Sequence, residues 1–304
     1  MNGPHRRRIV VAAMAALGAG LVAAGLVYRD QIYRYATHRK GSPTHTVAWE
    51  PLPTDDQMLH LAVLGDVGDS GSRLQATATA VDRLDAVQPL DGLVLLGDNV
   101  YPKGDPAGLP ATVFGPFARV LRHAPLHAIL GNHDVMRGHG DDQAAALGMP
   151  GRWWARHLDD VLLIGLDSTM ADDPDQAAWL IDTLARSNET WRIVLLHHPP
   201  YSAGYQGSSM DARRAFAPLF ERFGVQLVLS GHDHDYQRSR PIDGVTYVVT
   251  GGAAGTRRTG TADFTATSFS WHHFVEIGVY PDRIVIRAVN QDRRIADEAT
   301  VLAG

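Results

Sequence analysis

Short apolar runs recur along the chain, and each one ends in glycine or polar residues. Such runs, bounded by turn-forming residues, are typical of buried strands. They predict strands at 61–64, 93–96, 126–130, 161–167, 193–196 and 225–229. Segments with helical spacing lie between them, at 73–87, 112–123, 175–186 and 210–223. Strands that alternate with helices indicate an α/β fold with parallel sheets.

The pattern changes after Pro241, where apolar and polar residues begin to alternate. Strands are expected at 245–249, 274–280 and 283–289, and the last two resemble a hairpin. The Gly-rich segment 137–151 has no clear period and is expected to be a surface loop. We interpret 58–304 as one domain, with two βα halves whose sheets pack face to face.

The amino-terminal thirty residues differ from the rest. Arg6, Arg7 and Arg8 precede 9–28, a run of twenty residues without a charge. As a helix this run spans roughly 30 Å, which is enough to cross the hydrocarbon core of a bilayer. It is longer than the usual core of a signal peptide, so we favour a membrane anchor over a cleaved signal segment at 1–30.

A polar linker is expected at 31–57, where three prolines interrupt any regular element. Basic residues flank the apolar run on both sides and leave the membrane orientation open, and twin-arginine export is an alternative route. We expect a membrane-anchored or exported protein whose domain at 58–304 is extracytoplasmic.

The composition and the absence of certain motifs exclude several classes of function. The formal net charge of −5 shows no basic excess and implies no extended nucleic-acid surface. The chain has no cysteine, which excludes disulfides, thiolate zinc sites and a cysteine nucleophile. No Gly-x-Ser-x-Gly motif is present, and the Gly-rich turns lack the lysine of a P-loop.

The turn at 96–101 follows the apolar run 93–96 and carries Asp98 and Tyr101. A carboxylate directly after a buried strand lies at the carboxyl edge of a sheet, where open α/β folds build their sites. Alone, Asp98 is more simply explained as a strand-capping residue, since Gly-Asp turns are common.

Four other strand ends carry residues of the same kind. The candidate metal ligands at the five ends are Asp66, Asp98, Tyr101, Asn132, His133, His197, His232 and His234. Oxygen and imidazole donors without thiolate suit iron, manganese or zinc. One buried histidine after a strand is usually a core residue, but five such ends favour a two-metal site in which a carboxylate bridges the ions.

These residues carry a family resemblance. The ordered blocks are Gly65-Asp66, Gly97-Asp98-Asn99, Gly131-Asn132-His133-Asp134, His197 and Gly231-His232-Asp233-His234. In this order they are similar to the calcineurin-like metallophosphoesterases, which implies a four-layer α-β-β-α sandwich. The first block continues as Asp66-Val67-Gly68, where the superfamily usually has Asp-x-His. Tyr101 replaces that histidine, and this pairing resembles the purple acid phosphatase branch, especially the tartrate-resistant type.

The resemblance implies a role for each residue. Asp66, Tyr101 and His234 would bind the first metal; Asn132, His197 and His232 would bind the second; Asp98 would bridge them. It also implies that His133 lies beside the substrate, so Asp98 and His133 are the expected catalytic residues. We expect His198 to be packing or a residue behind the ligands. Asp134 and Asp235 either orient ligand imidazoles or are solvated loop carboxylates.

Charge counting favours a particular metal pair. Asp66, Asp98, a Tyr101 phenolate and a bridging hydroxide carry four negative charges, which two divalent ions would only neutralise. One trivalent ion leaves about +1 for a phosphate dianion, and Fe(III) is the hard cation that phenolate prefers. We therefore expect Fe(III) at the first site and Fe(II), Zn(II) or Mn(II) at the second.

The expected function is that of a binuclear metal-dependent phosphoric ester hydrolase. We expect an acid phosphatase acting on phosphomonoesters through a metal-activated hydroxide. A phosphodiesterase on the same site is the first alternative, and a membrane-tethered, non-catalytic binding protein is the second.

Overall fold

A computed structural model describes residues 41–303 of the chain. The expected anchor at 1–30 and the first ten residues of the expected linker lie outside this part. Within 41–303, no helix is both long enough and apolar enough to span a bilayer.

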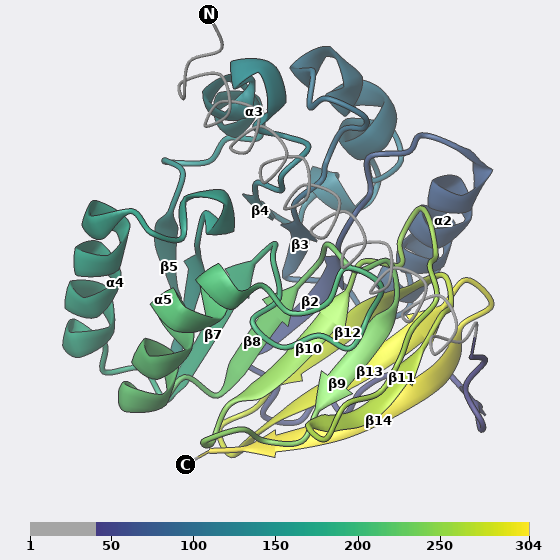
Figure 1. Cartoon of the computed structure of the whole chain (residues 1–304). Coiled ribbons are helices and arrows are strands. Elements are labelled where there is room, and N and C mark those ends of the chain that lie inside the picture. The colour runs from purple at the N-terminus through teal and green to yellow at the C-terminus, as the bar shows by residue number, and fades with distance from the viewer. Residues whose placement is uncertain (1–40, 304) are drawn as a thin grey trace, which may run out of the picture. The chain divides into compact units, whose positions relative to one another are not determined.

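Two seven-stranded sheets form the core of the domain (Figure 1). The first sheet has the order β1 (Val47–Ala48), β14 (Arg294–Leu302), β13 (Arg283–Asn290), β12 (His273–Val279), β2 (Leu59–Leu64), β3 (Gly92–Leu96), β4 (Leu126–Ile129). The second has the order β11 (Thr265–Phe269), β9 (Tyr236–Ser239), β10 (Thr246–Thr250), β8 (Leu227–Ser230), β7 (Trp191–Leu196), β6 (Val161–Gly165), β5 (Trp154–Leu158). Strands β2 to β4 are parallel, as are β6, β7, β8 and β10.

The sheets pack face to face, as predicted, and their strands alternate between two apolar environments. On β7, Ile193 and Leu195 belong to the core between the sheets, whereas Val194 and Leu196 face helices. This alternation follows from the two-residue period of a strand that is covered on both faces.

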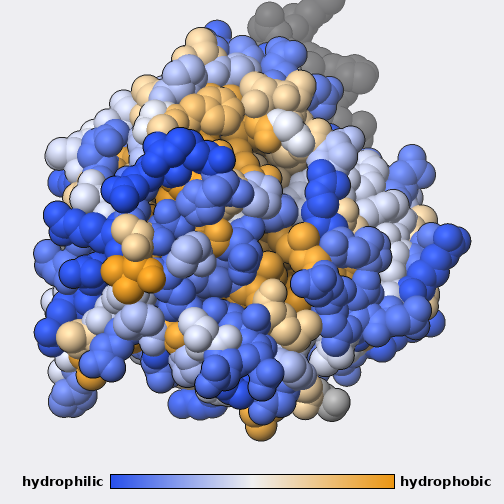
Figure 2. Space-filling model, turned by 180° about the vertical axis from the view of Figure 1, so that it is seen from behind, coloured by the Kyte–Doolittle hydropathy of each residue, from blue (hydrophilic) through white to orange (hydrophobic). Residues whose placement is uncertain are grey.

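Helices cover both outer faces. Helix α2 (Ser72–Asp85) packs on the first sheet, and α4 (Pro174–Arg186) and α5 (Met210–Arg222) pack on the second. The predicted four-layer α-β-β-α sandwich is therefore confirmed. Polar residues cover most of the face in Figure 2, and apolar residues show as smaller patches among them.

Two local predictions are wrong. Segment 112–123 is no continuous α-helix: it holds a π-helical turn, η2 (Pro110–Phe114), and a 3-10 turn, η3 (Val120–Arg122). Pro116 has no N–H to donate to a helical hydrogen bond and its ring crowds the carbonyl four residues earlier, which accounts for the break.

The Gly-rich segment 137–151 is also more regular than expected. It contains the short helix α3 (Gly140–Ala146), preceded by the 3-10 turn η4 (Met136–Gly138). Two further 3-10 turns are η1 (Pro106–Gly108) and η5 (Ser168–Met170).

Part of the segment expected as a linker packs on the domain. Val47 and Ala48 form β1, which pairs with β14. The indole Nε1 of Trp49 donates a hydrogen bond of 2.9 Å to Glu276, a buried carboxylate on β12. Residues from Val47 onward are thus held by the first sheet.

Candidate metal centre

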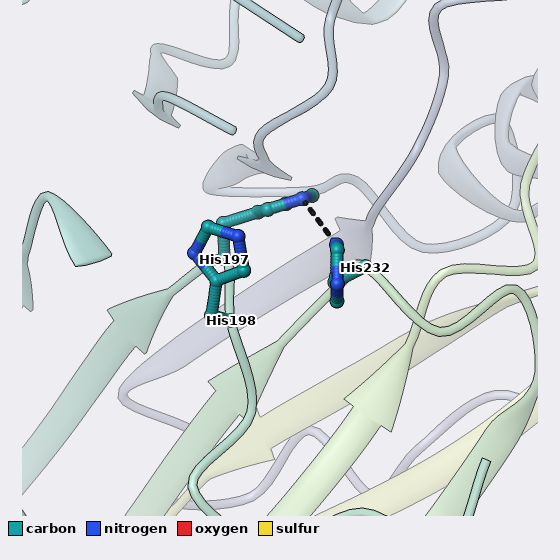
Figure 3. A group of neighbouring side chains, drawn as sticks. All are labelled: His197, His198 and His232. Carbon is teal, nitrogen blue, oxygen red and sulfur yellow. Dashed lines mark hydrogen bonds between the residues drawn. The ribbon is translucent and has the colours of Figure 1, made fainter. Parts of the chain in front are cut away.

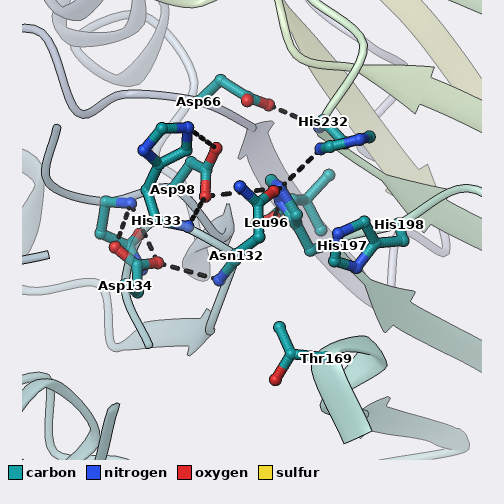
Figure 4. Close-up of polar contacts among 12 residues, drawn as sticks. Asp66, Leu96, Asp98, Asn132, His133, Asp134, Thr169, His197, His198 and His232 are labelled. Carbon is teal, nitrogen blue, oxygen red and sulfur yellow. Dashed lines mark hydrogen bonds and ion pairs between the residues drawn. The ribbon is translucent and has the colours of Figure 1, made fainter. Parts of the chain in front are cut away.

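The candidate ligands meet where the two sheets bring their carboxyl ends together. Asp66, Asp98 and Asn132 follow β2, β3 and β4 of the first sheet, and His197 and His232 follow β7 and β8 of the second. Figure 4 shows these five side chains converging from both sheets.

The first group of donors consists of Asp66, Tyr101 and His234. The Tyr101 hydroxyl lies 2.9 Å from Asp66 Oδ1 and 3.1 Å from His234 Nε2, and His234 Nε2 lies 3.1 Å from the same Asp66 oxygen. Donors roughly 2.1 Å from one ion, at tetrahedral or octahedral angles, are roughly 3.0–3.4 Å apart. The spacing of this group fits one cation.

The second group consists of Asn132, His197 and His232. His197 Nε2 lies 3.1 Å from Asn132 Oδ1 and 3.3 Å from His232 Nδ1. Asp98 Oδ1 lies 3.5 Å from the same His197 nitrogen, so Asp98 borders this group. One ligand atom each from Asp66, Asp98 and His197 lie within 4.8 Å of one another, so Asp98 is close to a member of each group.

The hydrogen bonds behind His197 fix which of its nitrogens faces the centre. His197 Nδ1 lies 2.8 Å from the backbone oxygen of Leu96, an acceptor, so Nδ1 carries the proton when the ring is neutral. The lone pair of Nε2 then points at the oxygens of Asn132 and Asp98. Three acceptors that face one another are the arrangement a cation stabilises, and the donor set therefore fits a metal ion.

The backbone at the ligands is unusual. Asp66, Asp98 and His232 have φ values of 61°, 52° and 70°. Left-handed backbone is uncommon outside glycine and collects at sites where the surrounding structure imposes it. Each of these residues directly follows a glycine at the end of a buried strand.

Burial and charge shift the titration of these groups in the absence of an ion. Burial, reinforced by Asp66 and Asp98, raises the pKa of Tyr101 far above its usual range. Burial alone would raise the pKa of Asp98, but His197 beside it holds that pKa below its usual range. Burial alone would lower the pKa of His197, but Asp98 beside it raises that pKa to about 10, so a metal ion at Nε2 would compete with a proton. Tyr101 needs a strongly charged cation to become a phenolate.

His133 lies beside Asp98. Its Nδ1 contacts the backbone oxygen of Pro102 at 2.7 Å, and its Nε2 lies 3.9 Å from Asp98 Oδ2. The ring packs edge-on against Tyr101, with 4.7 Å between ring centroids. With 31% of the side chain exposed, Nε2 is placed to reach a substrate at the centre.

Asp134 and Asp235 were expected either to orient ligand imidazoles or to be solvated, and the structure shows neither. Asp134 is fully buried and accepts hydrogen bonds from backbone amides of Asn99, Val100 and Gly131. Asp235 is also buried and accepts from Gln237. Both are therefore neither solvated nor hydrogen-bonded to a ligand ring; Asp134 instead holds together the turns that carry Asp98 and Asn132.

Sequence reasoning missed Ser168. Its Oγ lies 2.9 Å from both the backbone nitrogen and the Nδ1 of His198. The serine precedes His198 by thirty residues and belongs to no motif, so only the pairing of β6 with β7 brings the two together.

Residues 59–236 match the calcineurin-like phosphoesterase family, and the chain belongs to that family. Among curated proteins, it is 28% identical over 216 residues to tartrate-resistant acid phosphatase type 5 of Rattus norvegicus. That match covers 59% of this chain and 66% of the rat protein, so the chain spans just under two thirds of that relative.

Two solved structures share the fold. Purple acid phosphatase PPD1 from yellow lupin seeds has a TM-score of 0.70 at 16% identity, and the match covers 82% of this chain and 55% of that one. GAP50, described as the anchor in the inner membrane complex of Plasmodium, has a TM-score of 0.72 at 18% identity, covering 81% and 89%. The chain is thus a calcineurin-like phosphoesterase whose sequence relatives include acid phosphatases.

Proposed function

We propose that this chain is an acid phosphatase that hydrolyses phosphomonoesters at a binuclear metal centre. The observation that carries the proposal is the position of Asp98 between two sets of donors, each spaced for one ion. Asp66, Tyr101 and His234 would hold the first ion, and Asn132, His197 and His232 the second. Asp98 would bridge them.

The chemistry that two such ions supply is Lewis acidity toward phosphoryl oxygens and a lowered pKa for a bound water. The chain's own residues then orient the reaction. Asp98 lies near both groups of donors, and its Oδ1 accepts the backbone N–H of His133 at 2.9 Å. That bond fixes the backbone from which the His133 side chain extends. The Nε2 atom of His133 is placed to donate to a phosphoryl oxygen or to the leaving alkoxide.

The proposed metals are Fe(III) in the first group and Fe(II), Zn(II) or Mn(II) in the second. Support comes from Tyr101, whose hydroxyl is held against Asp66 and His234 in a buried position that resists ionisation without a cation. Ferric iron is a hard ion with high charge and therefore favours the phenolate more than a divalent ion does.

We also propose that the apolar run 9–28 anchors the protein, with the catalytic domain outside the cytoplasm. The support for the anchor is the sequence itself, in which twenty successive residues carry no charge. Basic residues flank this run on both sides, so the side of the membrane that holds the domain is decided by experiment. Protease treatment of intact cells tests this: digestion of the domain supports the proposal, and protection until lysis contradicts it.

The activity is tested with the full chain, using p-nitrophenyl phosphate as a monoester and bis(p-nitrophenyl) phosphate as a diester. We expect a higher kcat/KM for the monoester, and the loss of both metal ions and activity in Asp98→Asn. Asp142→Asn, on the exposed face of α3, is the matched control and should match wild type. A preference for the diester would favour the phosphodiesterase, and no hydrolysis with two ions bound would favour a binding protein.

A further inference from the structure

His198 lies at the rim of the second group of donors. Its ring centroid is 4.6 Å from that of His232 and 5.0 Å from that of His197, and both rings meet it edge-on. One nitrogen from each of the three rings lies within 4.8 Å of the others (Figure 3). The side chain is half-buried, so the ring is packed on one side and accessible on the other.

Ser168 determines which way the imidazole hydrogen points. Ser168 Oγ accepts the backbone N–H of His198 at 2.9 Å and lies 2.9 Å from His198 Nδ1. A hydroxyl that already accepts one hydrogen bond can direct its own hydrogen to Nδ1. We assign the ring hydrogen of His198 to Nε2 on that basis. Among residues 41–303, no hydrogen-bond partner of Nε2 is found.

A buried network holds Ser168 in place. The neighbouring Asp167 is fully buried, forms an ion pair of 2.6 Å with Arg152 and accepts from Thr169 Oγ1. Gln176 Oε1 accepts the backbone N–H of Asp167 at 2.8 Å. The turn that carries Ser168 is therefore fixed from several sides, and the orientation of the His198 ring is set before any ligand arrives.

We propose that His198 is a phosphate-binding residue that donates its Nε2 hydrogen to a non-bridging phosphoryl oxygen of the substrate, and that Ser168 positions it. A phosphoryl group bound at the second group of donors would contact the rings of His197 and His232, which His198 adjoins. The inference rests on the proposed function, because it places the phosphate at the same centre.

The test measures inorganic phosphate binding by calorimetry, and metal content, on the full metal-loaded chain. In His198→Ala we expect two ions still bound and a Kd for phosphate about 10-fold higher, as for one lost hydrogen bond to a charged group. His198→Gln keeps a donor of similar reach and should recover most of the affinity. Ser168→Ala should weaken binding about 3-fold, because the ring is less well oriented. His139→Ala, at the residue between η4 and α3, is the control and should bind phosphate as wild type does.

The results distinguish three roles of His198: phosphate binding, packing and metal ligation. An unchanged Kd in His198→Ala would show that the ring only packs, and the loss of one ion would show that it is a metal ligand; each result overturns the proposal. If His198→Ala does not fold, Ser168→Ala and His198→Gln decide. A wild-type chain that binds phosphate but hydrolyses no ester would overturn the proposed activity and leave the phosphate comparison valid.

Discussion

The Nδ1 atom of His197 lies 2.8 Å from the backbone oxygen of Leu96, and this hydrogen bond joins the two sheets. His197 follows β7 of the second sheet, whereas Leu96 ends β3 of the first. The same bond that orients a candidate ligand therefore also fixes the two sheets relative to each other at the centre. Changes in the turns that meet here should affect metal binding and stability together.

Gly131 tests this connection because it lies against Asp98. A Cβ at Gly131 would be 2.3 Å from both the backbone nitrogen and Oδ1 of Asp98, so Gly131→Ala must displace the proposed bridging carboxylate. We expect a loss of about 2 kcal/mol in the free energy of unfolding and a 10- to 100-fold loss of metal affinity. Urea denaturation and metal titration measure these. Gly151→Ala, where a Cβ has ordinary contacts, is the control; equal behaviour of both variants would contradict the prediction.

Asp134 should matter for stability more than its position in a loop suggests. Asp134→Ala would leave the backbone N–H groups of Asn99, Val100 and Gly131 without their buried acceptor. We expect the unfolding free energy to fall by at least about 3 kcal/mol, since each unpaired buried donor costs on the order of 1 kcal/mol or more. Chemical denaturation measures the change. The exposed Asp142→Ala should change the free energy of unfolding by less than about 0.5 kcal/mol. A similar effect in both variants would contradict the prediction.

His127 should make the domain less stable in acid. It lies on β4, and its buried Nε2 has no hydrogen-bond partner among residues 41–303. Burial, helped by Arg156, lowers the pKa of His127 to about 4. The unfolded chain, with a pKa near 6.5, binds this proton more readily. The contribution of His127 to the free energy of unfolding is therefore complete above about pH 6.5. As the pH falls toward 4, about 3 kcal/mol of that free energy is lost.

Unfolding free energies from pH 7 to 4.5 test this prediction. His127→Leu should lose less stability over that range than wild type, and the exposed His45→Leu should follow wild type. Parallel curves for wild type and His127→Leu would show that His127 does not contribute.

Much of the fold could be predicted from the sequence, because buried parallel strands leave continuous apolar runs. The strands 61–64, 93–96 and 193–196 lie inside β2, β3 and β7. Strands with one solvated face were harder to detect. In β5 and β14, polar residues such as Arg156 and Glu298 occupy the outward positions, and no apolar run remains.

The residues of the candidate site also divide into those that a sequence pattern reveals and those that it does not. Residues that follow buried strands, such as Asp66 and His197, could be found because the carboxyl ends of parallel strands share one edge. Ser168 could not be found, and the role of Asp134 could not be assigned, because both depend on contacts across the sheet and between turns. The strand pairing sets those contacts, and no local pattern records them.

The most direct test of the account is the visible absorption spectrum of the purified full chain, with metal analysis of the same sample. A Tyr101 phenolate bound to Fe(III) should give a broad visible band, with two metal ions per chain and at least one of them iron. Tyr101→Phe should lose that band while remaining folded. A colourless, iron-free and fully active protein would contradict the proposed Tyr101–Fe(III) centre and leave a metallophosphoesterase with two divalent ions.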